Sequence, residues 1–155
     1  IIVGNLPFNV STQLLFKWID MEKWPPFYQR MILMFQKEVA DRITSGHNSK
    51  SYGKISVACQ VRCKIKQLLD APPHIFNPTP KVHGTILDFE PYLKYKDIDY
   101  MKLKKLLELA FKNRRKKIKT NLKNYKNLLE ILEIDQNLRA ENLSISDFCQ
   151  LANIS

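Results

Sequence analysis

A short loop near the start of the chain holds the residues best suited to chemistry. An apolar run, typical of a strand, is followed by Asn5, Leu6, Pro7 and Phe8. The Asn5 side-chain oxygen and a backbone carbonyl, which we assign to Leu6, can accept both hydrogens of an exocyclic amine. Two such acceptors favour a pyramidal nitrogen and free its lone pair, so methylation of the amine needs no general base. Pro7 stiffens the turn, and Phe8 offers a flat face to a base extruded from its stack.

The residues around this loop predict a strand–helix–strand unit. Residues 1–4 are continuously apolar, as in a buried strand of a parallel sheet. Apolar side chains at helical spacing follow in residues 14–19, with Ser11 or Thr12 as the N-cap. Residues 31–35 are a second apolar run and indicate another buried strand. This order favours an α/β sheet. By itself the four-residue loop is only moderately specific, because an ordinary loop after a strand can have the same composition.

Farther along the chain the pattern is less even. Residues 55–65 mix β-branched residues with helical spacing, and the pattern leaves helix and strand both open. Residues 82–89 predict a strand that Pro91 ends. No glycine or proline occurs after residue 92, so we divide the chain into residues 1–92, an α/β part, and residues 93–155, an all-helical part.

Two patterns support the helical part. Five apolar residues lie on one helical face, and Ser144 with Asp147 resembles a capping box. The apolar set is Leu103, Leu106, Leu107, Ala110 and Phe111.

The chain is strongly basic, with a net charge of +10 and a pI of about 9.6. Such a charge favours a polyanionic partner, and a membrane surface is the competing interpretation. No apolar run reaches the roughly 18 residues needed to span a bilayer. Residues 112–126 contain eight basic residues and no acidic one. If they are helical, one cationic stripe is formed by Lys112, Lys116, Lys119, Lys123 and Lys126.

We interpret this stripe as a grip on a nucleic-acid phosphate backbone, which positions RNA without reading its sequence. A solvated lysine-rich face is the alternative.

The cysteines and histidines do not suggest a metal or disulfide site. Cys59, Cys63 and Cys149 have spacings that match neither a disulfide framework nor a zinc site. Cys59 and Cys63 lie one helical turn apart and are interpreted as buried helix residues. The three histidines are scattered. We therefore assign no metal and expect a reducing, cytoplasmic location.

Taken together, the motifs resemble the KsgA/RsmA family of small-subunit (16S) rRNA adenine dimethyltransferases along nearly the whole chain. Many matches in the same order are far more specific than one loop. They are VGNLPFNVST (3–12), QKEVADR (36–42), NSKSYG (48–53), PP (72–73), Phe76, PKV (80–82), Phe111, RRK (114–116), ID (134–135), RAEN (139–142) and CQLAN (149–153).

The resemblance implies the C-terminal portion of a Rossmann-like methyltransferase sheet plus a small all-helical domain that binds rRNA. It implies S-adenosylmethionine as methyl donor. The substrate would be two adjacent adenosines near the 3′ end of small-subunit rRNA, each dimethylated on its exocyclic amine during ribosome assembly. Asn5 maps to the catalytic-loop asparagine, which also borders the cofactor, and Phe8 to the base-stacking aromatic.

Further roles follow from the same resemblance. Phe76 falls where related enzymes place a second aromatic on the base's other face, with an ordinary core phenylalanine as the alternative. Arg114, Arg115 and Lys116 look like rRNA contacts, although some of them could be salt-bridged within the helical domain. With the rest of the basic stretch, the RNA-binding candidates are Lys112, Arg114, Arg115, Lys116, Lys119 and Lys123.

The sequence departs from the family pattern at two places. Phe8 stands where tyrosine is commoner, which keeps stacking but removes a hydroxyl. The chain's four glycines are also too far apart to form the Gly-rich turn that cradles such a cofactor. We therefore expect an N-terminally truncated chain that is inactive alone. A strand left without its neighbour at residues 1–4 would invite self-association.

Two other hypotheses stay open. An Erm-like enzyme acting on large-subunit rRNA would share the Asn-x-Pro-aromatic loop, but its C-terminal domain does not usually carry the RAEN and CQLAN motifs. A non-catalytic RNA-binding or assembly factor on the same scaffold would retain the basic surface. The intact loop from Asn5 to Phe8 argues against lost catalysis.

Overall fold

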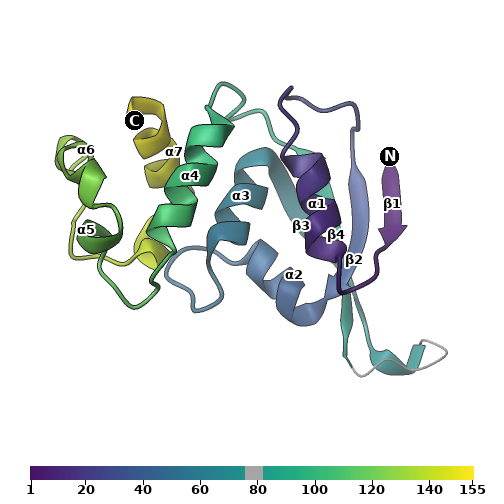
Figure 1. Cartoon of the computed structure of the whole chain (residues 1–155). Helices are drawn as coiled ribbons and strands as arrows, with labels where there is room; N and C mark the ends of the chain where they lie inside the picture. The colour runs from purple at the N-terminus through teal and green to yellow at the C-terminus, as the bar shows by residue number, and fades with distance from the viewer. Residues whose placement is uncertain (76–81) are drawn as a thin grey trace. The chain divides into compact units, whose positions relative to one another are not determined.

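The computed structural model describes residues 1–75 and 82–155, which divide into two compact units (Figure 1). The first unit comprises Ile1–Thr44 and Cys59–Lys96, and the second comprises Ser45–Ala58 and Asp97–Ser155. The functional division at residue 93 stays a prediction. By contacts, the helical unit resumes at Asp97 and also includes residues 45–58, which the sequence-based division placed in the α/β part.

The first unit is built on a four-stranded mixed sheet. Its strands are β1 (Ile2–Asn5), β2 (Met31–Gln36), β3 (Cys63–Ala71) and β4 (Gly84–Pro91), in the spatial order β1-β2-β4-β3. β1 pairs with β2 in parallel, whereas β4 is antiparallel to both β2 and β3. The predicted α/β unit and its strand at residues 31–35 are therefore confirmed.

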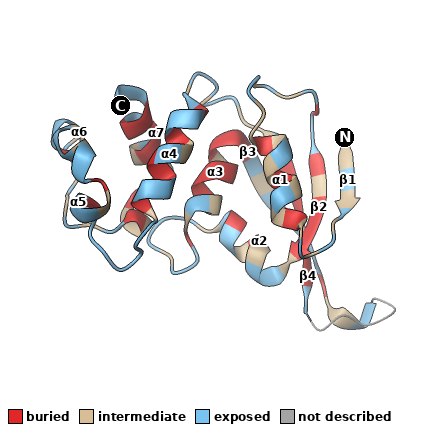
Figure 2. Cartoon of the chain, viewed as in Figure 1, coloured by how far each residue is buried: buried red, intermediate tan, exposed pale blue. Residues whose placement is uncertain are grey.

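The central strands carry the core of this unit. Leu33 of β2 and Leu87 and Phe89 of β4 are completely buried, and Figure 2 shows both strands largely in red. Asp88 of β4 is also buried. Its carboxylate accepts hydrogen bonds from Nε and Nη2 of Arg30, at 2.7 and 2.5 Å. A charged pair of this kind satisfies a carboxylate that would otherwise be costly to bury.

β1 does not have the burial that its sequence suggested. We expected a continuously buried strand, but its residues alternate between intermediate and exposed, and Val3 is 73% exposed. The expectation was wrong because successive side chains of a strand point to opposite faces. β1 lies at one edge of the described sheet, and the face that Val3 shares with Asn5 is exposed.

Helices follow both parallel strands. α1 (Ser11–Ile19) makes the crossover between β1 and β2, as a parallel pair requires. Neither predicted cap is used: Val10 is the N-cap residue, and the Ser11 hydroxyl donates to the carbonyl of Phe8 instead, at 3.1 Å. α2 (Lys37–Thr44) begins directly after β2 and contacts β2, β3 and β4.

The ambiguous stretch at residues 55–65 contains both predicted structures. α3 (Lys54–Arg62) ends where β3 begins, so Cys59 is helical and Cys63 is the first residue of a strand. The interpretation of Cys63 as a helix residue was therefore wrong. Both thiols are buried and free, and burial raises the pKa of Cys63 to about 12. After β3, a short 3-10 helix, η1 (Pro73–Ile75), begins the connection to β4.

The second unit is helical. It contains α4 (Tyr100–Ala110), α5 (Ile118–Asn121), η2 (Lys123–Tyr125), α6 (Lys126–Ile131), η3 (Ala140–Asn142) and α7 (Ile145–Ile154). The predicted apolar face of α4 is confirmed for Leu103, Leu106, Leu107 and Ala110, whereas Phe111 is the half-buried C-cap residue of the helix. Within the described residues, no helix is both long and apolar enough to cross a membrane. The fully buried residues of this unit include Leu103, Leu106, Leu107, Ala110, Phe148 and Leu151.

Residues 112–126 do not form one helix, so the predicted single lysine stripe is wrong. The chain turns after α4, and Lys117 pairs with Arg139 in an isolated antiparallel bridge. The Asn121 side chain donates to the carbonyls of Ala110 at 2.7 Å and Asn113 at 3.1 Å. These long-range and capping bonds satisfy backbone groups at the end of α4 and replace continuation of the helix.

The capping box predicted for α7 is confirmed and gives a stability prediction. The amide of Asp147 donates to the Ser144 hydroxyl at 3.2 Å, and the amide of Ser144 donates to the Asp147 carboxylate at 2.7 Å. Ser144→Ala should lower the free energy of unfolding by about 1 kcal/mol, measured by urea denaturation. Ser146→Ala, at an exposed position of the same helix, is the matched control. Equal effects of the two changes would contradict the role assigned to the cap.

Candidate active site and RNA-binding surface

Three strands of the first unit end at the same edge of the sheet. Because β4 is antiparallel to both β2 and β3, and β1 is parallel to β2, the strands β1, β2 and β3 all point the same way. The loop that begins at Asn5, the turn from Gln36 into α2, and Pro72 after β3 therefore lie along one edge. Gly84, the first residue of β4, starts from the same edge. Residues far apart in the sequence are brought together here.

The loop after β1 has a distinctive distribution of hydrogen bonds. The Pro7 carbonyl accepts from the amide of Val10 at 3.0 Å, and the Phe8 carbonyl accepts from the Ser11 hydroxyl. Among the described residues, none donates a hydrogen bond to the Leu6 carbonyl or to the Asn5 side chain. Asn5 is exposed at the end of β1, and Phe8 is half-buried. Two acceptors that are adjacent in sequence thus have no internal hydrogen-bond partner among the described residues, and Phe8 follows them in the same loop.

Gly4 supports the shape of this loop. A Cβ atom at that position would lie 3.1 Å from Cδ2 of Leu6 and 3.3 Å from Cδ2 of Leu33. The glycine therefore lets the Leu6 side chain pack close to the strand just before the turn.

An open hollow of about 920 Å³ occupies part of the same edge. The residues lining it include Gln36, Lys37, Glu38, Asp70, Pro72 and His83. The ammonium of Lys37 lies 3.8 Å from the Asp70 carboxylate, which also accepts from the Thr85 hydroxyl at 2.9 Å. Asn5 and Phe8 do not line this hollow, so it is a neighbour of their loop along the edge. Phe76, the predicted second stacking aromatic, lies outside the described residues.

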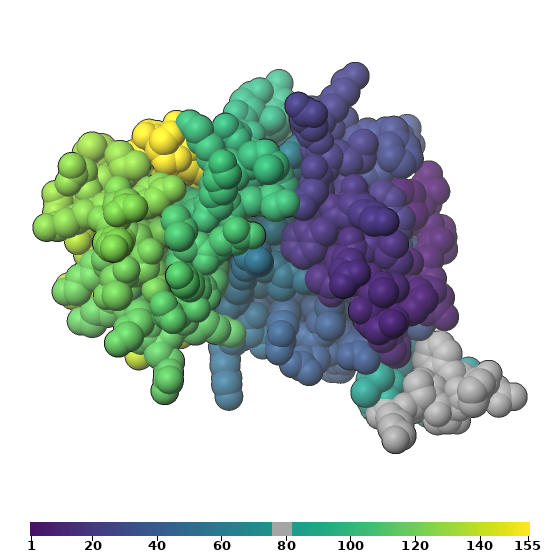
Figure 3. Space-filling model, in the orientation of Figure 1, coloured from purple at the N-terminus to yellow at the C-terminus, as the bar shows by residue number. Residues whose placement is uncertain are grey.

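Most of the predicted RNA-binding residues of the second unit are free cations at the surface, light green in Figure 3. Lys112, Arg115, Lys116 and Lys123 are exposed and form no ion pair with any described residue. Lys119 is also exposed, and its ammonium donates to the Asn137 side chain at 3.1 Å.

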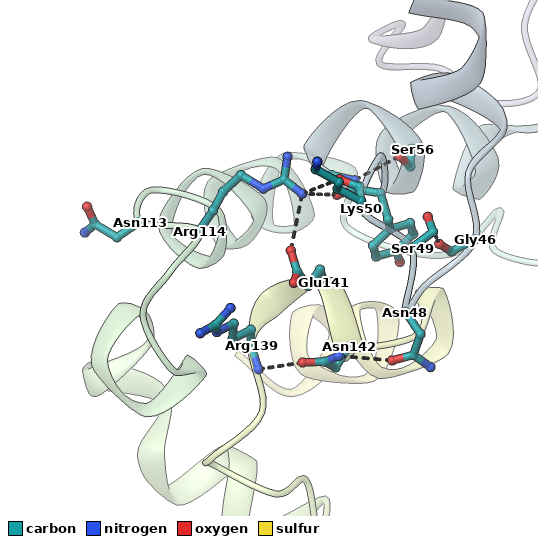
Figure 4. Close-up of polar contacts among 12 residues, drawn as sticks. Gly46, Asn48, Ser49, Lys50, Ser56, Asn113, Arg114, Arg139, Glu141 and Asn142 are labelled. Atoms are coloured by element: carbon teal, nitrogen blue, oxygen red, sulfur yellow. Dashed lines mark hydrogen bonds and ion pairs between the residues drawn. The ribbon is translucent and has the colours of Figure 1, made fainter. Parts of the chain in front are cut away.

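Arg114 differs from its basic neighbours. Its Nη2 atom donates to the carbonyls of Lys50 at 2.8 Å and Tyr52 at 3.1 Å, and lies 3.3 Å from the Glu141 carboxylate (Figure 4). The structure thus gives this residue intramolecular partners, as the sequence analysis had allowed for some of the basic residues. The contact with residues 50–52 was not foreseen, because nothing in sequence spacing relates position 114 to position 50.

Tyr52 anchors the same loop in the second unit. Its side chain is completely buried, and its ring centroid lies 6.2 Å from that of Phe111, which in turn lies 5.7 Å from that of Phe148. Its hydroxyl has no hydrogen-bond partner among the described residues. Burial, and then the nearby groups of Asp147 and Cys149, raise the pKa of this phenol above its usual range.

This unpaired hydroxyl leads to a stability prediction. Tyr52→Phe should leave the free energy of unfolding unchanged or raise it by up to about 1 kcal/mol, because it removes an unsatisfied polar group. Tyr52→Ala should lower it by about 3–5 kcal/mol by emptying the aromatic site. Thermal and urea unfolding of the two variants measure this. A loss of more than about 1 kcal/mol in Tyr52→Phe would show that the hydroxyl is bonded after all.

The fit of a nucleotide-like cofactor to this chain is limited. No two of its four glycines are close in sequence, and the turn after β1 contains a proline rather than a glycine-rich loop. Among the described residues there is also no group of three or more histidines, cysteines or acids that could hold a metal ion.

Comparisons with known proteins agree with one another. A family model described as ribosomal RNA adenine dimethylase matches residues 1–155. The "Ribosomal RNA small subunit methyltransferase A" of Bartonella tribocorum is 44% identical over 155 residues, which are 99% of this chain and 56% of the relative. The relative of the same name from Sinorhizobium fredii is 42% identical over 98% of this chain and 52% of its own length. The chain thus spans about half the length of the curated relatives it matches.

Two solved structures resemble the fold. A dimethyladenosine transferase from Plasmodium falciparum has a TM-score of 0.85 and 26% identity, over 96% of this chain and 64% of that one. The predicted Rossmann-like methyltransferase architecture is thereby confirmed. The 23S rRNA methyltransferase ErmE has a TM-score of 0.70 but only 14% identity, over 97% of this chain and 63% of that one. This second likeness shows the fold alone.

Proposed function

Because this chain belongs to the ribosomal RNA adenine dimethylase family, we propose that it acts in the methylation of small-subunit rRNA. The reaction is transfer of methyl groups from S-adenosylmethionine to the exocyclic amines of two adjacent adenosines near the 3′ end of that rRNA. The names of its relatives support small-subunit rRNA as the substrate. The likeness to the large-subunit enzyme is distant and concerns the fold, so an Erm-like function is not favoured.

The observation that carries this proposal is the pair of free acceptors after β1. In this loop, the carbonyls of Pro7 and Phe8 accept hydrogen bonds from Val10 and Ser11. The Asn5 side-chain oxygen and the Leu6 carbonyl remain for the two hydrogens of an adenine amine. An isolated amine is a poor nucleophile because its lone pair is delocalised into the ring. Accepting both hydrogens favours a pyramidal nitrogen with its lone pair directed outward.

The remaining residues of the loop hold the base. Phe8 stacks on the extruded adenine, a contact worth about 1–3 kcal/mol, and Pro7 keeps the acceptors in place. S-adenosylmethionine, when bound, supplies a methyl group on a positively charged sulfur. Asn5 borders that cofactor, and the residues of this chain contribute no glycine-rich turn to its site. Phe76 remains our candidate for the second face of the base on the strength of the sequence resemblance.

The second unit supplies the grip on the RNA backbone. Exposed cations without acidic neighbours in sequence attract phosphates and position RNA without reading its bases. We assign this role to Lys112, Arg115, Lys116, Lys119 and Lys123. The partner is the assembling small ribosomal subunit in the cytoplasm, and three buried cysteines that form no disulfide support a reducing compartment. Self-association through the exposed edge of β1 stays a prediction.

A chimera tests the catalytic role of Asn5. This chain would replace the matching residues of the Bartonella tribocorum relative, and methyl transfer from labelled S-adenosylmethionine to unmethylated small subunits would be measured. Asn5→Ala should reduce the rate about 100-fold or more, as expected when one polar group aimed at the reacting atoms is lost. RNA binding should be unchanged. Asn9→Ala is the matched control, because Asn9 is an exposed amide in the same turn.

The outcomes separate the hypotheses. Methylation that persists in Asn5→Ala would refute the assignment of the acceptor. Methylation of large subunits in preference to small ones would favour the Erm-like alternative. A parent chimera that binds RNA but methylates neither subunit would favour a non-catalytic assembly factor.

A further inference from the structure

The loop of residues 48–52 is attached to the rest of the second unit from one side by Arg114. A single guanidinium nitrogen serves the carbonyls of Lys50 and Tyr52 and also meets the carboxylate of Glu141. The plane of the guanidinium fixes the directions of this nitrogen's two hydrogens, whereas the donors of a lysine ammonium rotate freely. Bonds from one side chain to two carbonyls two residues apart fix the course of the backbone between them.

A second attachment holds the start of the loop. The amide of Asn48 donates to the Glu141 carbonyl at 2.8 Å, and the Asn142 side chain donates to the Asn48 side chain at 3.1 Å (Figure 4). Asn142 is itself oriented by the amide of Arg139, which donates to it at 3.0 Å. Asn48 has a φ of 66°, a left-handed conformation that asparagine tolerates better than most residues. Together with buried Tyr52, these contacts hold the loop at both ends.

The held loop presents a cation. Lys50 is exposed, and its ammonium pairs with no acid among the described residues. Residues 46–53 contain no acid, and the exposed hydroxyl of Ser51 beside Lys50 is able to bond a phosphate oxygen. Arg114, by contrast, has its charge offset by Glu141 and one of its nitrogens committed to backbone carbonyls.

We propose that Lys50 is an additional contact to the RNA phosphate backbone, and that Arg114 is the positioning residue that holds it there. This inference takes RNA as the ligand from the proposed function, and nothing else in it depends on that function. It extends the RNA-binding surface to a segment outside the basic stretch at residues 112–126. It also changes the role of Arg114 from a phosphate contact to a support for one.

Salt dependence of binding tests the contact. The chain would be titrated into a labelled transcript of the 3′-terminal hairpin of small-subunit rRNA at several KCl concentrations, with fluorescence anisotropy as readout. The slope of log affinity against log salt is negative, and Lys50→Gln should make it shallower by about 0.7–0.9, the value for one phosphate. Lys54→Gln removes the same charge from a lysine 3.8 Å from Glu108 and should leave the slope unchanged.

Two charge-conserving variants test the positioning. Asn142→Ala and Arg114→Lys each break one attachment without altering net charge, and each should make the slope shallower as Lys50→Gln does. Combining either with Lys50→Gln should cause no further loss. Amide exchange should quicken in residues 48–52 while α4 and α7 stay protected, which shows that the unit is still folded.

Several results would overturn the inference. If Lys50→Gln had the same salt dependence as the parent chain, Lys50 would not contact a phosphate. A quickened loop with an unchanged slope, or additive losses in the double variants, would show that Arg114 and Lys50 act separately. The chimera assay is independent: active methylation without a Lys50 effect refutes this inference alone, and a Lys50 effect without methylation refutes the proposed function alone.

Discussion

β2 forms hydrogen bonds with a parallel strand on one side and an antiparallel strand on the other. A parallel neighbour cannot be reached by a tight turn, so the chain must cross over through α1 before it returns. The antiparallel neighbour β4 reverses direction, and β3 reverses it again. This mixed arrangement is what leaves three strand ends, and the polar loop after β1, at one edge of the first unit.

In both units, we distinguish chemical from structural roles by whether a polar group has a hydrogen-bond partner within the chain. In the loop after β1, internal bonds use two carbonyls, and the Leu6 carbonyl and the Asn5 side chain accept no hydrogen bond from the described residues. At Arg114 the reverse holds, because a side chain of the type that binds phosphates donates to its own chain. Residue type alone would assign the same role to Arg114 and Arg115. Their hydrogen bonds distinguish them, because Arg114 donates to backbone carbonyls of its own chain and Arg115 is exposed.

The sequence predicted those features that depend on near neighbours. The strand at residues 31–35, the apolar face of α4 and the Ser144 capping box involve residues within a few positions of each other, and all three are confirmed. The order of the motifs also identified the family. Exposure of β1 could not be predicted, because continuous apolar residues do not reveal whether both faces of a strand are covered.

The failures share a physical cause. Residues 112–126 have the composition of a helix, but α4 ends at Ala110, and Lys117 pairs with Arg139, more than twenty positions away. Ser11 does not cap α1 as predicted. Its hydroxyl instead donates to the Phe8 carbonyl, and this bond depends on the shape of the preceding loop. Likewise, the contact between Arg114 and the loop at residue 50 spans 64 positions. No periodicity or spacing rule carries such information.

The two units are interleaved along the chain, since residues 45–58 belong to the second unit although residues before and after them belong to the first. An expression clone that starts at Asp97 would therefore omit Tyr52 and leave the ring of Phe111 with only one of its two aromatic neighbours, Phe148. It would also free the donors of Arg114. The helical unit consequently cannot be excised as a contiguous piece, and a cut in the protein backbone near residue 45 or 58 should disturb both units at once.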